Sequence, residues 1–299
     1  MLMQYTCPLC NNTAELFTAG TLLPEQFFSQ KNVYAIAESE RKKQLPLYAC
    51  IKCGHGFTPI DIDPLLIEKW YQNTEEDLAF LADEEARRVT ARTILKKIGR
   101  YIAPHGHLLD VGCGAGIFVS EAARCGWDAA GLEASVRAVE WGREKFGISL
   151  TTGNMDSFKT MPPETFDVIT MFDVIEHVAD PAQFIELVSR VLKPSGWLII
   201  TTPKFDSFLA RFMGKHWYCI FPAHIHYFTS KSLHQVLHQS GFKIVNSRAH
   251  TRYLSLGYFG QRLLGLINPN YQIAHTKFHS TIIPVNLGDE FEVYAQKIS

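Results

Sequence analysis

The sequence has no excess of charge of either sign and no long apolar run. Its 29 Lys and Arg residues against 30 Asp and Glu residues give a net charge of −1 over 299 residues, which excludes a global attraction to nucleic acid or to anionic membranes. No apolar run approaches the roughly 18 residues that a membrane-spanning helix needs, and the opening MLMQYTCPLC lacks the basic-then-apolar pattern of a secretory signal. We therefore expect a cytoplasmic protein without a membrane partner.

Internal repeats and low-complexity tracts are also lacking, and the length leaves room for one large domain with an appendage. We expect a small module over residues 1–60, a helical linker or lid over 61–101, and an α/β domain over 102–299. Two stretches rich in aromatic residues and histidine, 203–228 and 249–287, break the pattern of the large domain. We expect them to be insertions that contact a substrate, because such loops tend to carry specificity.

Cysteine is not scarce: the seven cysteines include two C-x2-C pairs. The pairs are Cys7 with Cys10 and Cys50 with Cys53, and two such pairs are the ligand pattern of a tetrahedral four-cysteine zinc site. Four thiolates leave no open position on the ion, which argues against a catalytic zinc. We expect a structural zinc ion. The alternatives are reduced cysteines without metal, or a site in which the neighbouring His55 replaces one thiolate.

Apolar strand patterns alternate with amphipathic helix patterns from residue 107 onwards. Repeated strand and helix units predict an α/β fold with a Rossmann-like, mostly parallel sheet of seven strands and helices on both of its faces. The expected strands are 107–111, 127–132, 148–151, 166–171, 197–202, 242–248 and 289–296, and the expected helices are 116–125, 134–146, 181–192 and 230–239. Residues 193–196 (KPSG) are expected to form a turn after the third of these helices.

The most informative segment, residues 108–117 (LLDVGCGAGI), joins a buried strand to a helix. Its alternating glycines let the backbone turn tightly and approach a ligand at a helix N-terminus. Glu133 ends the next strand, and a carboxylate in that place can bind ribose hydroxyls. A dinucleotide loop, G-x-G-x-x-G/A, would need a small third residue, but Ile117 or Val119 stands there. This spacing argues against a dinucleotide cofactor.

The form D-x-G-x-G-x-G resembles motif I of the class I S-adenosylmethionine-dependent methyltransferases. Three further segments are similar to this superfamily and follow in its order: 166–178 (FDVITMFDVIEHV), 189–196 (SRVLKPSG) and 201–203 (TTP). The subgroup resembled contains ubiquinone-biosynthesis O-methyltransferases and other small-molecule methyltransferases. The resemblance covers residues 107–203 and implies S-adenosylmethionine as the cofactor.

The resemblance also implies a cofactor site at motif I and at the ends of the following strands. Its members would be Asp110, Gly112, Gly114 and Gly116 on the methionine and ribose side, Glu133 at the ribose hydroxyls, Ala134 and Met155 beside the adenine ring, Asn154 at the adenine amino group, and Phe172 and Asp173 beside the sulfonium and the incoming nucleophile. Asn154 stands where many relatives have Asp, and its side-chain oxygen can accept the same hydrogen bond.

Methyl transfer to a hydroxyl or to an α-carbon needs a group that removes the acceptor's proton. Imidazole is the natural base near neutral pH. The candidates are His226 and His224, in the segment FPAHIHYF, and His177, which follows the second of the similar segments. The alternative for each is a histidine that shapes the pocket through hydrogen bonds. His224 and His226 could also be metal ligands, but that site would need a third ligand nearby.

These observations favour a methyltransferase that acts on an oxygen or carbon of a small-molecule acceptor of the sugar, quinone or secondary-metabolite type. A cysteine-rich module before such a core is similar to that of sugar C-methyltransferases, although those enzymes carry a further C-terminal domain. An RNA methyltransferase is the first alternative, but residues 1–60 contain five Lys and Arg against four Asp and Glu, too neutral for an arm that binds phosphates. A non-catalytic protein that binds S-adenosylmethionine would need a damaged motif I, which is intact here. We expect a monomer or a homodimer.

Overall fold

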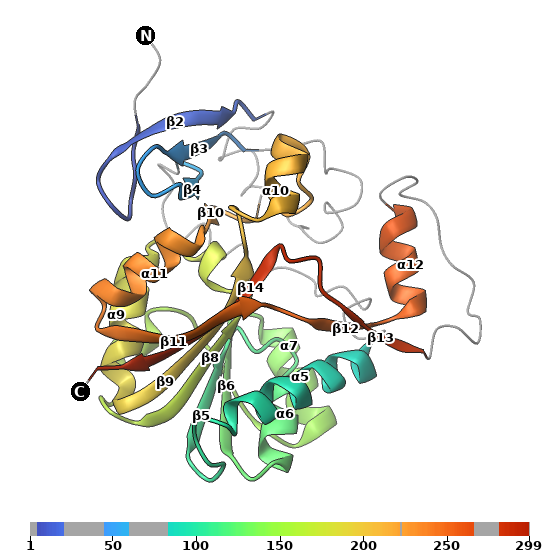
Figure 1. Cartoon of the computed structure of the whole chain (residues 1–299). Helices are drawn as coiled ribbons and strands as arrows, with labels where there is room; N and C mark the ends of the chain where they lie inside the picture. Colours follow the sequence, from blue (N-terminus) through green and yellow to red (C-terminus); the bar gives the residue numbers. More distant parts are fainter. Residues whose placement is uncertain (1–4, 21–44, 60–82, 222, 266–280, 299) are drawn as a thin grey trace.

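The computed structural model describes residues 5–20, 45–59, 83–221, 223–265 and 281–298. A seven-stranded sheet lies at its centre (Figure 1). In spatial order the strands are β11 (Phe242–Ala249), β14 (Glu290–Lys297), β9 (Leu192–Pro203), β8 (Phe166–Phe172), β5 (His107–Val111), β6 (Asp128–Glu133) and β7 (Ser149–Thr152). The strands from β9 to β7 pair in parallel, whereas β14 is antiparallel to both of its neighbours. The expectation of a mostly parallel, seven-stranded sheet is confirmed.

Helices cover both faces of this sheet, with α5, α6 and α7 on one side and α9 and α11 on the other (Figure 1). The helices are α5 (Glu84–Ile98), α6 (Ile117–Arg124), α7 (Val136–Phe146), α8 (Ser157–Thr160), α9 (Pro181–Val191), α10 (Phe208–Met213), α11 (Ser230–Gln239) and α12 (Leu256–Gly265). Residues 60–82, which include most of the expected linker or lid, lie outside the described part of the chain.

Alternate residues of the parallel strands divide between two apolar cores, because successive side chains of a strand point to opposite faces. The core shared with α5, α6 and α7 contains Leu108, Val168 and Ile199, and the core shared with α8, α9 and α11 contains Leu109, Ile169 and Ile200. All six side chains are almost fully buried. This arrangement explains why the strands appear in the sequence as continuous apolar runs.

Two helices, α9 and α11, begin at capping residues that the sequence provides. The Asp180 side chain accepts a hydrogen bond from the Gln183 amide (2.9 Å) at the start of α9, and Thr229 with Ser232 forms a capping box at the start of α11. Residues 193–196, expected as a turn, are instead part of β9. The register of β9 with β8 shifts there, and Ser195 takes a left-handed φ of 62°, so the expected turn is an irregularity within the strand.

A second, smaller sheet joins segments that lie far apart in the sequence. Its strands are β1 (Tyr5–Thr6), β2 (Thr13–Thr18), β3 (Leu47–Cys50), β4 (Gly56–Phe57) and β10 (His226–Tyr227), each antiparallel to the next. Strand β10 comes from the expected insertion at 203–228 and pairs with β4 of the expected N-terminal module (Figure 1). Module and insertion therefore share one sheet, which the sequence pattern did not indicate.

The expected insertion at 249–287 contains a ribbon of two antiparallel strands, β12 (Arg252–Ser255) and β13 (Ile282–Val285), with α12 following β12. The ribbon is tied to α5 because the Tyr253 amide donates a hydrogen bond to Thr90 Oγ1 (2.9 Å). Among the described helices, none is both long and apolar enough to cross a bilayer.

Candidate functional site

The loop between β5 and α6 turns through three glycines in the left-handed region. The φ angle is +66° at Gly112, +52° at Gly114 and +78° at Gly116, values that L side chains rarely adopt. Gly112 also lies against Val174 of the loop after β8, because a Cβ atom at 112 would stand 2.5 Å from Val174 Cγ2. Conformation and space therefore both require glycine at position 112.

Glu133, at the end of β6, reaches the middle of this loop. Its Oε2 accepts a hydrogen bond from the Gly114 amide (2.9 Å), and its Oε1 accepts one from the Ser135 amide (3.0 Å). Strands β5 and β6 are parallel neighbours, so their carboxyl ends meet at one edge of the sheet. The structure thus brings the glycine loop and the predicted ribose-binding carboxylate together, with Ala134 half-buried beside them.

Asp110 is buried under the same loop, and its Oδ1 accepts a hydrogen bond from Thr170 Oγ1 (2.6 Å). Burial raises the pKa of Asp110 to about 7, the Thr170 bond opposes this rise, and the charge of Glu133 adds to it. Asp110 is therefore only partly ionised at neutral pH, and a positively charged ligand beside the loop would favour its ionised form.

Phe172 and Asp173 stand where β8 ends. The Phe172 ring packs edge-on against Phe118 of α6, with ring centroids 4.8 Å apart. Asp173 has a left-handed φ of 56°. Its carboxylate is held from two sides, by an ion pair with Arg252 of β12 and by a hydrogen bond from the Thr201 hydroxyl (3.3 Å). The first residue after β8 is therefore fixed in a defined orientation.

Asn154 lies just before α8. Its Oδ1 accepts hydrogen bonds from the Asp156 amide (2.9 Å) and the Ser157 amide (3.3 Å) at the start of α8. The side-chain oxygen expected at an adenine amino group is thus already engaged by the backbone, as is common for Asn in turns. Met155, next to it, is partly buried against the larger apolar core.

Glu176, His177 and His224 converge beside the loop after β8. The first two lie in the short 3-10 helix η1 (Ile175–His177), and His224 comes from the insertion after β9. One ligand atom of each residue lies within 4.8 Å of the others, and His224 Nε2 is 3.9 Å from Glu176 Oε1. Glu176 Oε2 accepts a hydrogen bond from Thr202 (2.9 Å), whereas the buried Oε1 has no hydrogen-bond partner among the described residues.

Backbone carbonyls fix the orientation of the two imidazole rings. His177 Nδ1 lies 2.8 Å from the Ala223 oxygen, and His224 Nδ1 lies 2.9 Å from the Cys219 oxygen. A carbonyl oxygen only accepts hydrogen bonds, so in each neutral ring Nδ1 carries the hydrogen and Nε2 carries the lone pair. This tautomer is the one that a proton acceptor or a metal ligand needs at Nε2.

Burial controls the charges in this cluster. Burial lowers the pKa of His224 well below its ordinary value, and the neighbouring His177 lowers it further. Burial also lowers the pKa of His177, against the effect of its bond to Ala223. Burial and then the charge of Asp173 raise the pKa of Glu176. At neutral pH both imidazoles are therefore neutral bases.

His226, the third candidate base, has other neighbours. Its Nδ1 lies 3.0 Å from His55 Nε2, and its Nε2 lies 3.4 Å from the Ala179 oxygen. Both ring nitrogens thus face protein groups, and the residue is only 5% exposed. The structure pairs His177 with His224, whose ring centroids are 4.7 Å apart, and places His226 within the second sheet, in β10.

The four paired cysteines meet at one point. The Sγ of Cys10 lies 3.4 Å from that of Cys50 and 3.6 Å from that of Cys53, and Cys7 Sγ lies 3.7 Å from Cys53 Sγ. A tetrahedral zinc ion with Zn–S bonds of about 2.3 Å would have its sulfur ligands about 3.8 Å apart. The four thiols therefore fit such an ion. His55, considered as a substitute ligand, contacts His226 instead.

Sequence reasoning missed Glu176, Arg252 and Glu290. Glu176 directly precedes His177 in the segment DVIEH, so a signal was present. Arg252 forms ion pairs with both Asp173 and Glu290. It lies in the insertion at 249–287, where no local motif marks it.

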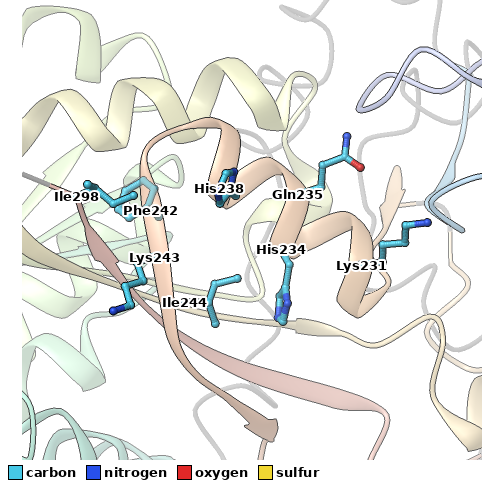
Figure 2. Close-up of a pocket in the computed structure, with 8 residues that line it drawn as sticks. All are labelled: Lys231, His234, Gln235, His238, Phe242, Lys243, Ile244 and Ile298. Carbon is cyan, nitrogen blue, oxygen red and sulfur yellow. The ribbon is translucent and has the colours of Figure 1, made fainter.

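A groove of about 750 Å³ lies elsewhere, between α11 and β11 (Figure 2). Its lining residues are Lys231, His234, Gln235, His238, Phe242, Lys243, Ile244 and Ile298. The predicted cofactor residues, histidine bases and paired cysteines are all absent from this lining, so the groove is not part of the site described above.

Comparison with known proteins places this arrangement in a family. A sequence model of the methyltransferase domain matches residues 83–247, a range that includes the glycine loop, Glu133 and the Glu176–His177 pair. The chain belongs to this family. Its expected membership of the class I S-adenosylmethionine-dependent methyltransferases is thus confirmed.

Individual methyltransferases resemble part of the chain. The ubiquinone biosynthesis O-methyltransferase of Cereibacter sphaeroides is 34% identical over 118 residues, which are 37% of this chain and 47% of the relative. The one of Thiobacillus denitrificans is 31% identical over 100 residues, 32% and 43% of the two chains. The match thus spans less than half the length of either relative. A SAM-dependent methyltransferase structure from Archaeoglobus fulgidus has a TM-score of 0.53 at 18% identity, with 74% of this chain and 100% of that chain covered, which shows the shared fold.

The fit of Gly112 against Val174 predicts a specific cost for a side chain in the methyltransferase loop. Gly147, at the end of α7, has a similar φ of +63° but nothing within 4 Å of an added Cβ. Both Gly112→Ala and Gly147→Ala carry the strain of a left-handed alanine, about 1–2 kcal/mol. We expect Gly112→Ala to lower the free energy of unfolding in urea by about 1–3 kcal/mol more than Gly147→Ala does, because the added methyl group is overpacked against Val174.

The double variant Gly112→Ala/Val174→Ala is the control for this steric argument. Shortening Val174 removes the atom 2.5 Å away, so it should recover part of the difference. Equal unfolding free energies for Gly112→Ala and Gly147→Ala would contradict the argument.

Proposed function

We propose that this chain transfers the methyl group of S-adenosylmethionine to an oxygen or carbon of a small-molecule acceptor. The observation that carries the proposal is the contact of Glu133 with the glycine loop, because it sets a carboxylate beside a backbone cradle at the carboxyl edge of parallel strands. The names of the relatives, which refer to ubiquinone biosynthesis, support a quinone-like or phenolic acceptor over RNA.

The cofactor would be held by the residues around this loop. Gly112, Gly114 and Gly116 would border the methionine and ribose, and Glu133 would accept hydrogen bonds from the ribose hydroxyls, in exchange for its bond to the Gly114 amide. When bound, S-adenosylmethionine supplies a methyl carbon activated by the sulfonium charge. The acidic surroundings at Asp110 suit that charge.

The proton of the acceptor would be removed by His224 or His177. Each ring presents Nε2 as its acceptor nitrogen because a backbone carbonyl holds Nδ1, and each is a neutral base at neutral pH. Burial raises the pKa of Glu176, but a positive charge on His224, whose Nε2 is 3.9 Å from Glu176 Oε1, would favour the ionised carboxylate, and the pair would then stabilise the imidazolium. His226 is a weaker candidate because both of its ring nitrogens contact protein groups.

A second chemistry at the same residues is favoured by one observation. The ligand atoms of Glu176, His177 and His224 lie within 4.8 Å of one another, and two imidazoles with a carboxylate are a common ligand set for divalent cations. Such an ion would bind and polarise the acceptor hydroxyl and lower its pKa. The three side chains would then act as ligands and not as the base.

The four paired cysteines would hold a structural zinc ion. Their sulfur separations match a tetrahedral site, and four thiolates complete the coordination of the ion. Because Cys7 and Cys10 lie between β1 and β2, Cys50 ends β3 and Cys53 lies between β3 and β4, the ion would stabilise the second sheet.

The cofactor proposal predicts that Glu133→Gln weakens binding of S-adenosylhomocysteine by about 10- to 100-fold, because charge-assisted hydrogen bonds to the ribose are lost. Calorimetric titration of the full chain measures this, with NAD as the comparison ligand. Glu144→Gln, an exposed site on α7, should bind as the wild type does. A wild-type chain that binds NAD and not S-adenosylhomocysteine would refute the proposal.

The base proposal predicts that His224→Gln lowers kcat by about 100- to 10,000-fold, while the affinity for S-adenosylhomocysteine stays unchanged. Phenols, catechols and nucleotide-linked sugars are the acceptors to screen first. If an imidazole is the base, Mg²⁺ or Mn²⁺ should not restore any activity that the wild type loses on treatment with EDTA, whereas Zn²⁺ can restore activity lost from the four-cysteine site. Activity that Mg²⁺ or Mn²⁺ restores would favour a bound cation over an imidazole base.

The zinc proposal predicts one zinc ion per chain, measured by atomic absorption on purified protein. Cys10→Ser should lose the ion and unfold at a lower temperature, because three thiolates bind zinc more weakly than four. Cys125→Ser is the matched control, since Cys125 is exposed and lies outside the cluster. Equal zinc contents in both variants would disprove a four-cysteine site.

A further inference from the structure

The segment 223–227, which carries His224, is hydrogen-bonded on both sides to different parts of the chain. On one side β10 pairs with β4, and the Thr58 amide donates to the Ile225 oxygen (3.0 Å). On the other side the Ile225 amide donates to the Glu176 oxygen of η1 (3.0 Å). The segment therefore lies between the four-cysteine module and the loop that follows β8.

The His226 side chain bridges the same two parts, and its hydrogen bonds have a fixed direction. Ala179 offers a carbonyl oxygen, so His226 Nε2 must carry the hydrogen and donate to it. His226 Nδ1 is then the acceptor, and His55 Nε2 donates to it (3.0 Å). This tautomer leaves His55 Nδ1 as a lone pair, and that atom is buried without a hydrogen-bond partner among the described residues.

The bridge ends close to both histidines of the proposed site. Ala179 lies two residues after His177, and His226 lies two residues after His224. The two segments are also joined by the bond between His177 Nδ1 and the Ala223 oxygen. A shift of the His226 ring would therefore move the backbone on which both candidate bases depend.

We propose that His226 is a positioning residue, which together with His55 transmits the position of the four-cysteine module to His177 and His224. The inference rests on the proposed function of those two histidines. The module then forms a supporting wall of the acceptor site, and its position sets where the base stands. This role differs from that of an appendage that recognises a substrate by itself.

Three substitutions separate the two halves of the bridge. In His226→Gln the amide nitrogen can take the place of Nε2 and donate to Ala179, while the bond from His55 is lost. In His226→Asn the amide oxygen can take the place of Nδ1 and accept from His55, while the bond to Ala179 is lost. His226→Phe removes both bonds and keeps the volume. His238→Gln, at an exposed site on α11, is the control.

The readouts are the ring N–H signals of His177 and His224 in ¹⁵N-histidine-labelled full-length protein, together with kcat, zinc content and affinity for S-adenosylhomocysteine. The two signals are assigned with His177→Gln and His224→Gln. We expect all three variants to lose or shift both signals, because each one breaks at least one of the two bonds that join His55 to Ala179 through His226. In all three, kcat should fall by about 10- to 100-fold, the cost of a misplaced catalytic group, with zinc content and cofactor affinity unchanged.

The proposal is overturned if the Asn and Phe variants keep both N–H signals, as His238→Gln should. It is also overturned if His226→Gln keeps both signals, since the bond from His55 would then transmit nothing, or if cofactor affinity falls together with the signals, since the role would then be general stability. The NMR readout does not require an acceptor. If the wild-type chain transfers no methyl group to any acceptor, the proposed function is refuted. The NMR spectra still decide whether His226 positions the rings of His177 and His224.

Discussion

The parallel pairing of β5 with β6 and β8 is the constraint on which the site depends. In this register Asp110 stands opposite Gly131 on one side and Thr170 on the other, so the buried hydrogen bond from Thr170 to Asp110 follows from the pairing. The same pairing brings the carboxyl ends of the strands to one edge, where the glycine loop, Glu133 and Asp173 follow directly. A shift of the pairing register by one residue would turn every side chain of the shifted strand to the other face of the sheet. Both the apolar core and the site would then be lost.

The acceptor side depends on a different contact, the short pairing of β10 with β4. Two residues of strand are too few to be stable alone, and the pairing is supported by bonds from Thr58 and His55 on one side and to Glu176 and Ala179 on the other. A consequence is that three histidines are buried where the two sheets meet. Since burial lowers the pKa of all three, they act as neutral hydrogen-bonding groups there.

What could be predicted from the sequence was encoded locally. The glycine loop and the cysteine pairs carry spacings that only a few structures satisfy, and the mostly parallel sheet follows from repeated strand and helix units. The neighbours of His226 could not be predicted, because they depend on a pairing between β4 and β10 that no pattern in either segment specifies. The hydrogen bonds of Asn154 were not predicted either. Two nearby backbone amides donate to its side-chain oxygen, a local contact that the comparison of motifs does not reveal.

The unpaired Glu176 oxygen beside the loop after β8 bears on the proposed site. A buried polar oxygen without a hydrogen-bond partner costs about 1–3 kcal/mol, and Glu176 Oε1 has no partner among the described residues. Burial raises the pKa of this carboxyl group and so favours its protonated form, in which an oxygen can donate a hydrogen bond as well as accept one. Under the proposed function, a substrate hydroxyl would bind between this carboxyl group and the Nε2 atom of His224. Recognition of the substrate and removal of its proton would then rest on the same cluster of side chains.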